Sequence, residues 1–182
     1  MTFHSHAKAD LSPGQKAPGF ALKSAAGKRV SLSDLKGKVV VLEWLNHGCP
    51  FVRKHYDSGN MQKLQSEFTE KGVVWISIIS SAEGKQGYST PDKALQDKAT
   101  YKSKATYILL DKDGSVGRSY GAKVTPHMYI LNKKGEVIYL GGIDSIASTN
   151  KNDIKEARPF VKEALNSFLS GEKVKVKESR PY

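Results

Sequence analysis

The segment KVVVLEWL, from Lys38 to Leu45, limits the possible fold more than any other part of the chain. It is an almost unbroken apolar run between Gly37 and Gly48, which is typical of a strand buried on both faces of a sheet. Such a sheet needs helices on both faces, so the segment predicts an α/β domain. Pro50 follows where a first helical residue tolerates proline, and a helix is predicted to begin there or at Cys49.

The rest of the chain alternates between strand and helix patterns. Buried strands are predicted at 73–80 and 106–111, and helices at 50–72, with a loosening at 58–60, and at 91–102. Further predictions are an N-terminal hairpin about Ala26 and Gly27, an antiparallel hairpin at 127–144 about the turn 132–135, and a final helix at 154–168. We therefore expect a mixed β-sheet flanked by helices, with an N-terminal β-hairpin extension.

The length of 182 residues suits one domain, at 11–171, between a flexible terminus at 1–10 and a basic tail at 172–182. The net charge is +11, but the lysines are scattered and no recognition motif accompanies them, so nucleic acid is not an expected partner. The tail SGEKVKVKESRPY is expected to be solvated and strand-like. No apolar run approaches the roughly 18 residues of a membrane span.

The first residues contain no apolar core of the signal-peptide type. Both the cytoplasm and, for a mature exported form, the bacterial periplasm remain open as locations. The oligomeric state is open as well.

Cys49 is the only cysteine, so an internal disulfide is excluded. At a helix start, the unpaired backbone N–H groups and the helix dipole stabilise a thiolate, which is the nucleophilic form of cysteine. His47, Arg53 and Lys54 are close in sequence and are expected to add positive charge or to transfer protons. The alternative is a small buried core cysteine without chemistry.

The dipeptide Thr125-Pro126 directly precedes the apolar strand of the second hairpin. A proline entering a strand removes a donor from the ladder, and a cis peptide bond in a tight turn would account for it. An ordinary trans proline at a strand start is the alternative.

Together these features resemble the thioredoxin fold, in the redoxin and peroxiredoxin-like (AhpC/TSA) branch. The resemblance covers about 11–169 and is most specific in NHGCPFVRKHY, SGNM, GKQG and YGAKVTPHMYILNKKGEVIY. It implies that Val124, Thr125 and Pro126 form the cis-proline loop that faces Cys49 and binds extended substrate backbone. It also places Val52 where thioredoxins have their second, resolving cysteine.

The resemblance implies thiol–disulfide exchange through Cys49, with a protein or small molecule that carries a thiol or disulfide as substrate and reductant and with no cofactor. Because Val52 has no thiol, a second molecule must release the mixed disulfide. A one-cysteine peroxidase is the runner-up. The peroxiredoxin positions for threonine, proline and arginine hold Asn46, Leu42 and Pro126, so the peroxide-binding residues of that family are not visible.

A third possibility is a binding module without catalysis, which grips a partner peptide at the Pro126 loop or a metal ion with His47, Cys49, His55 and His127. His55 is otherwise expected to be a solvated or helix-packing residue, and Trp75 a core residue. The residues expected to shape the site around the catalytic Cys49 are Trp44, Asn46, His47, Pro50, Thr125, Pro126 and His127.

Overall fold

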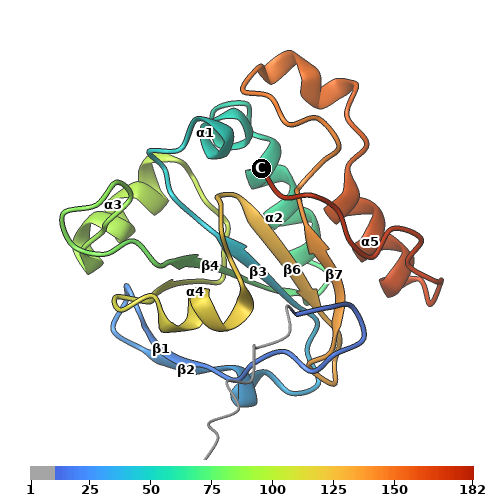
Figure 1. Cartoon of the computed structure of the whole chain (residues 1–182), viewed down its shortest axis with the longest axis horizontal. Coiled ribbons are helices and arrows are strands. Elements are labelled where there is room, and N and C mark those ends of the chain that lie inside the picture. The colour runs from blue at the N-terminus through green and yellow to red at the C-terminus, as the bar shows by residue number, and fades with distance from the viewer. Residues whose placement is uncertain (1–10) are drawn as a thin grey trace, which may run out of the picture.

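The computed structural model describes residues 11–182, so the segment predicted as a flexible N-terminus lies outside the described residues (Figure 1). The strands are β1 (Ala21–Ser24), β2 (Arg29–Ser31), β3 (Val40–Trp44), β4 (Val74–Ile79), β5 (Tyr107–Leu110), β6 (His127–Leu131) and β7 (Val137–Gly141). The α-helices are α1 (Pro50–Asp57), α2 (Asn60–Thr69), α3 (Pro91–Thr100), α4 (Ser115–Tyr120) and α5 (Phe160–Leu169). Two 3₁₀ helices, η1 (Leu32–Leu35) and η2 (Lys151–Lys155), complete the described elements.

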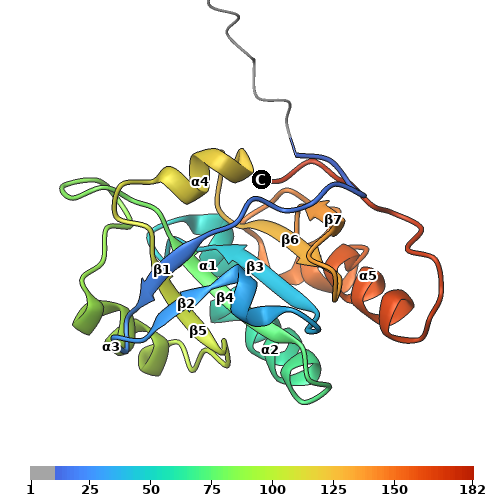
Figure 2. The ribbon, with the colours of Figure 1, turned by 90° about the horizontal axis from the view of Figure 1, so that it is seen from below.

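The strands form one seven-stranded mixed sheet in the order β2-β1-β5-β4-β3-β6-β7. The central strands β3, β4 and β5 are parallel, and the outer pairs are antiparallel. Figure 2 shows α4 on one side of the sheet and α2, α3 and α5 on the other. Each face has its own apolar cluster, one containing Val41 and Trp75 and the other Leu42 and Ile76, because alternate residues of β3 and β4 point to opposite faces. All five residues of β3 are buried, as the apolar run predicts.

The predicted break within the first helix is present. Gly59, with φ of +76°, ends the turn after α1 and leads into α2. Such a backbone conformation is easily adopted only by glycine. The predicted helix is therefore two separate helices. The first, α1, is short and begins directly after Cys49.

Two predictions about helices were incomplete. The pattern at 154–168 is divided into η2 and α5, because Pro159 lacks an N–H group and disfavours helical backbone at the residue before it. The helix α4 was not predicted at all. It has only six residues and includes Gly117, so neither its length nor its composition gives a helical signal.

The C-terminal tail packs against the domain, whereas the sequence predicted a solvated segment. Val174 is buried, and Leu140 of β7 exchanges backbone hydrogen bonds with Lys177 and Ser179 at 3.0 and 3.1 Å. A parallel bridge between Leu140 and Glu178 agrees with the strand-like character expected of the tail. The alternating valines are the cause, because every second residue of the tail can face the core while the lysines between them remain in water.

The side chain of Tyr182 closes over a buried cluster of charged and polar groups. Its hydroxyl donates to Asp144 Oδ1 at 2.5 Å and lies 3.2 Å from His55 Nε2. The Lys54 side chain has no exposed surface, and its Nζ donates to the Ile146 carbonyl at 2.8 Å and lies 3.5 Å from Asp144 Oδ2. Since Lys54 and His55 belong to α1, this cluster fixes the helix that begins at the cysteine.

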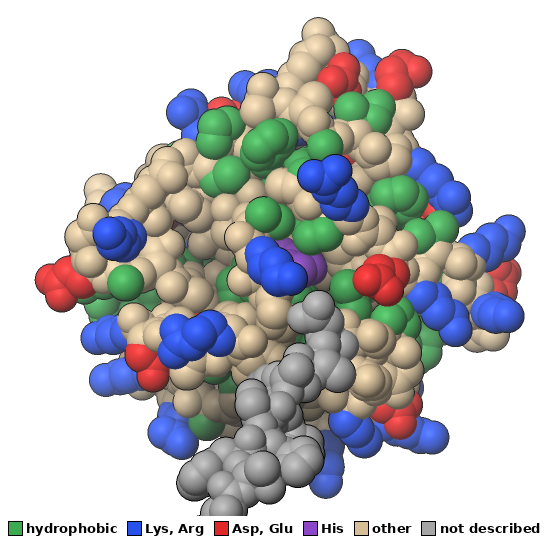
Figure 3. Space-filling model, viewed as in Figure 1, with side chains coloured by type: hydrophobic (Ala, Val, Ile, Leu, Met, Phe, Trp, Pro, Cys, Tyr) green, Lys and Arg blue, Asp and Glu red, His purple; other side chains and the backbone are tan. Residues whose placement is uncertain are grey.

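Lysine and arginine side chains surround the periphery of the face shown in Figure 3, with acidic side chains between them. Among the residues that the structure describes, no helix combines the length and the apolar character needed to cross a membrane.

We expect Gly141→Ala to destabilise the fold by detaching the tail from β7. A Cβ atom at Gly141, which has φ of +140°, would lie 2.3 Å from the Ser179 carbonyl oxygen, and this backbone atom cannot move aside cheaply. A loss of about 3 kcal/mol of unfolding free energy is expected in urea titrations. The matched control is Gly171→Ala, which also has a positive φ but has no atom within 4 Å of the added Cβ, so about 1 kcal/mol is expected. Equal losses in both variants would contradict the role of tail contact.

Candidate functional site

Cys49 lies in the connection between β3 and α1, directly before the first residue of the helix. Its backbone N–H donates to the Asn46 carbonyl at 2.9 Å, and it is the N-cap residue of the helix that begins at Pro50. Its thiol donates to the Thr125 carbonyl, with 3.0 Å between Sγ and O. The residue is partly exposed, so the sulfur is held at the surface end of a buried strand and is not sealed in the core.

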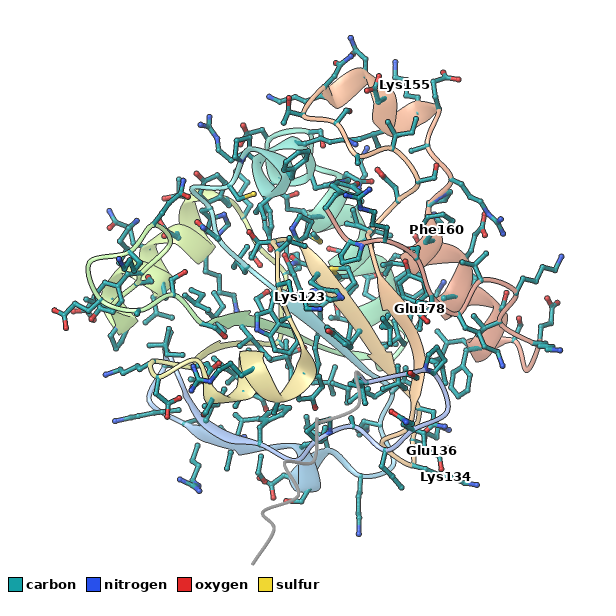
Figure 4. The ribbon with its side chains drawn as sticks, in the orientation of Figure 1. Lys123, Lys134, Glu136, Lys155, Phe160 and Glu178 are labelled. Carbon is teal, nitrogen blue, oxygen red and sulfur yellow. The ribbon has the colours of Figure 1, made fainter. Side chains whose placement is uncertain are left out.

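The peptide bond between Thr125 and Pro126 is cis. The register of the sheet brings this bond to the cysteine, because Trp44 at the end of β3 pairs with His127 at the start of β6. The residues just beyond the two strands therefore meet at one sheet end. Val124, next to Thr125, is an exposed apolar side chain, and Figure 4 shows Lys123 on the same connection between α4 and β6.

The turn before Cys49 is held from two sides. Asn46 Oδ1 accepts from the Gly48 N–H at 2.8 Å, and Gln86 Nε2 donates to the Gly48 carbonyl at 2.9 Å. The loop containing Gln86 approaches so closely that a Cβ on Gly87 would lie 2.4 Å from Asn46 Cγ. A pocket of about 280 Å³ opens beside the turn and is lined by Leu45, His47, Tyr88, Tyr101 and neighbouring residues.

His47 does not supply the positive charge that its place in the sequence suggests. Its ring stacks on Tyr101, with 4.0 Å between centroids and 7° between planes, and burial lowers its pKa to about 4. The side chain is therefore neutral at physiological pH.

The other two cations near Cys49 in the sequence have partners elsewhere. Arg53 Nε lies 3.5 Å from Asp57 Oδ2, and Lys54 is bound within the Tyr182 cluster. The expectation that these charges activate the cysteine directly is therefore not supported by the geometry.

Trp44 and His127 are paired between β3 and β6, directly next to the cis bond. The Trp44 ring lies 5.2 Å from both Tyr120 and Tyr129, and its Nε1 donates to Ser80 at 3.1 Å, so it packs in the core. His127 is buried directly after Pro126, and burial lowers its pKa to about 4. Its Nε2 is buried without a hydrogen-bond partner among the described residues.

The four residues considered as metal ligands do not form a site. Within 11–182, no group of three or more His, Cys, Asp or Glu side chains is arranged to hold a metal ion. His55 packs inside the Tyr182 cluster, with Nδ1 2.8 Å from Asn60 Nδ2, which is the helix-packing role considered for it.

Glu43 was missed by the sequence analysis, although an acidic residue inside an apolar strand was a visible signal. Its carboxyl has no exposed surface and accepts hydrogen bonds from four side chains, Tyr56, Gln65, Trp75 and Ser77. Burial raises the pKa of Glu43, while the four donors oppose that shift. The Tyr56 ring also contacts His47 edge to face at 4.8 Å, so one chain of contacts leads from the buried carboxyl to the turn before Cys49.

Comparison with known proteins gives a consistent result. The family model described as Redoxin matches residues 12–157. The thioredoxin-like protein YneN of Bacillus subtilis (strain 168) is 31% identical over 153 residues, which are 83% of this chain and 85% of that protein. The thiol-disulfide oxidoreductase ResA of Halalkalibacterium halodurans is 28% identical over 147 residues, 78% of each protein.

Among solved structures, a candidate thiol:disulfide interchange protein DsbE from Chlorobium tepidum matches with a TM-score of 0.63 and 24% identity, over 89% of this chain and 98% of that one. This likeness concerns the fold. It confirms the expected thioredoxin-like mixed sheet flanked by helices.

We expect Glu43→Gln to remove a pH-dependent loss of stability. The pKa of Glu43 is raised above the ordinary value of 4.5. Its contribution to the free energy of unfolding is therefore fully present below pH 4.5 and is lost as the pH rises through the folded-state pKa. The difference in unfolding free energy between variant and wild type should therefore grow in favour of the variant above pH 4.5, by about 1.4 kcal/mol for each unit of pKa shift. Urea titrations from pH 4.5 to 8 measure it.

The matched control is Glu172→Gln, an exposed carboxyl in the tail, whose difference from wild type should be constant over this range. A constant difference for Glu43→Gln as well would show that burial does not perturb this carboxyl.

Proposed function

Because the chain belongs to the redoxin family, we propose that it is a thiol–disulfide oxidoreductase that acts through Cys49 alone. The observation that carries the proposal is the placement of the Cys49 sulfur at a helix N-terminus, 3.0 Å from the carbonyl of Thr125. The name of the relative ResA, a thiol-disulfide oxidoreductase, supports the thiol–disulfide chemistry, and YneN is named as thioredoxin-like. The single-cysteine mechanism rests on this chain's own residues.

The reaction begins when Cys49 loses its proton to solvent and its thiolate attacks one sulfur of a disulfide R–S–S–R′. A bond forms between Cys49 Sγ and the sulfur of R, the original S–S bond breaks, and R′–S⁻ leaves with the electron pair. The disulfide is then shared between the protein and R. No net oxidation occurs, because one S–S bond replaces another.

The second step needs a thiol from another molecule. Val52 has no exposed surface and occupies the position one helical turn after Cys49, where a resolving thiol would lie. An external thiolate R″–S⁻ attacks the sulfur of R in the mixed disulfide, so R–S–S–R″ forms and the Cys49 thiolate is restored. The reductant is therefore a small thiol or a thiol-containing protein.

The loop at Thr125 and Pro126 is the proposed guide for the substrate. The Thr125 carbonyl lies within hydrogen-bond distance of the reacting sulfur, and the exposed Val124 beside it offers apolar contact. An extended peptide laid along this loop would bring its disulfide to Cys49. Pro126 and the following His127 are buried, so they anchor the loop to the domain.

We expect the reaction with the aromatic disulfide DTNB to distinguish one thiol from two. The wild type should release one equivalent of thionitrobenzoate and keep the other as a mixed disulfide on Cys49. In Val52→Cys, the added thiol can attack that mixed disulfide, so two equivalents should be released and no label retained. Absorbance counts the released anion, and mass spectrometry detects the retained label.

Cys49→Ser is the control and should release none. Equal release by the wild type and by Val52→Cys, with the Val52→Cys protein shown to be folded, would contradict the proposed geometry of attack.

Oxidation of Cys49 by hydrogen peroxide is expected to be slow, within about tenfold of a small thiolate at the same pH. In the structure Asn46 Oδ1 accepts from the Gly48 N–H and the nearby Arg53 contacts Asp57, so neither side chain is placed as a peroxide-binding group beside the sulfur. Stopped-flow measurement under pseudo-first-order conditions gives the rate constant. A rate several orders of magnitude higher would instead assign a one-cysteine peroxidase.

A further inference from the structure

The end of the sheet remote from Cys49 carries a concentration of positive charge. Five lysines gather there, and we call them the lysine pole: Lys16, Lys36, Lys38, Lys133 and Lys134. Strand β3 starts beside the lysine pole and ends near Cys49, so the two regions are separated by at least the strand length of about 15 Å. Figure 4 shows Lys134 and Glu136 at the β6–β7 turn, at the opposite end of the sheet from α1.

An apolar pocket of about 210 Å³ opens in the middle of the lysine pole. Its apolar lining comes from Ala17, Leu32, Leu35, Val40 and Leu131. Four lysines of the pole, Lys16, Lys36, Lys38 and Lys134, also line it, and none of its lining residues is acidic. The pocket therefore combines an apolar interior with a cationic rim.

Backbone and side-chain bonds hold the three segments around the pocket together. The Gly37 N–H donates to the Lys133 carbonyl at 3.0 Å, and the Ala17 N–H donates to the Gly135 carbonyl at 2.9 Å. The Lys16 ammonium donates to the Lys134 carbonyl across the rim. The pocket is thus a fixed feature of the fold and not a gap between mobile loops.

The lysines of the rim are not paired with carboxylates within 11–182. None of its four lysines forms an ion pair with a carboxylate of those residues. Two acidic side chains are close to these lysines in the sequence, but neither lines the pocket: Asp34 accepts from the Ser31 N–H, and Glu136 accepts from Asn132. An anion is the complement that this rim lacks.

We propose that this pocket binds a small anionic amphiphile, a free molecule with a carboxylate, sulfonate or phosphate head and one short acyl chain or aromatic ring. The apolar part would fill the pocket, and the head would lie among the rim lysines. The volume sets the size, because pockets for drug-sized ligands begin at about 300 Å³. This site is independent of Cys49.

The test is titration of sodium octanoate into the ¹⁵N-labelled full chain. Octanoate should shift the amide signals of η1 and of residues 132–135 and should saturate at millimolar concentration or below. The neutral analogue 1-octanol and the short anion acetate should bind at least tenfold more weakly, because each has only one of the two required features. Added salt should weaken octanoate, because the rim charges are exposed to solvent.

A charge-matched pair of variants separates the pocket from the overall charge of the protein. Lys36→Gln/Lys38→Gln/Lys134→Gln should weaken octanoate binding at least tenfold. Lys63→Gln/Lys85→Gln/Lys155→Gln removes the same charge from exposed positions elsewhere and should bind within twofold of the wild type. Thermal unfolding establishes that both variants are folded. Equal weakening in both, or signal shifts away from the pocket, would overturn the proposal.

A second arm distinguishes a free ligand from a lipid surface. The protein is sedimented with vesicles of phosphatidylcholine alone or mixed with phosphatidylglycerol. Failure of octanoate to bind, together with sedimentation on the anionic vesicles that needs the same three lysines, would replace the free amphiphile by a membrane surface and overturn the proposal as stated.

Discussion

The antiparallel register between β3 and β6 is the constraint on which the site depends. Pairing of Trp44 with His127 means that the chain leaving β3 and the chain entering β6 meet at one point, and this is where the Cys49 sulfur reaches the Thr125 carbonyl. A slip of one residue would turn the whole strand over and separate the two groups. The buried aromatic rings around Trp44 oppose such a slip, since each fits one face of the sheet.

The buried charged groups around the site bind other parts of the domain and do not contact the Cys49 sulfur. Lys54 and Asp144 are buried together beneath Tyr182, and Glu43 is enclosed by four donors on the other side of α1. An unpaired buried charge would be costly, so each of these groups constrains the elements that carry its partners. The helix that starts at Cys49 is thereby held on two sides through Lys54 and Tyr56, while within residues 11–182 the thiol forms one weak hydrogen bond, to the Thr125 carbonyl.

Much of the fold could be predicted from local patterns. The strands β3 and β4 are nearly continuous apolar runs. Pro50 marks the start of the first helix, Gly72 follows the end of the next, and Gly135 lies in the turn of the second hairpin. The position of Cys49 at a helix start followed in the same way. What could not be predicted depends on contacts between distant residues. The burial of His47 depends on Tyr101, the direction of Lys54 depends on Asp144, and the packing of the tail depends on Gly141, which leaves room for Ser179. Glu43 was missed because its hydrophobic neighbours dominated the strand pattern.

Packing of the C-terminal tail on β7 also determines how a second polypeptide can associate with this domain. Leu140 uses both its N–H and its carbonyl on the tail, so the outer margin of the sheet is occupied there, and the opposite margin is β2, which has only three residues. A second polypeptide that added a strand to the sheet would need a long, unpaired edge strand, and neither edge offers one. Association by an added strand is thus disfavoured at both margins, whereas the strand ends, one of which carries the sole thiol, are not closed in this way.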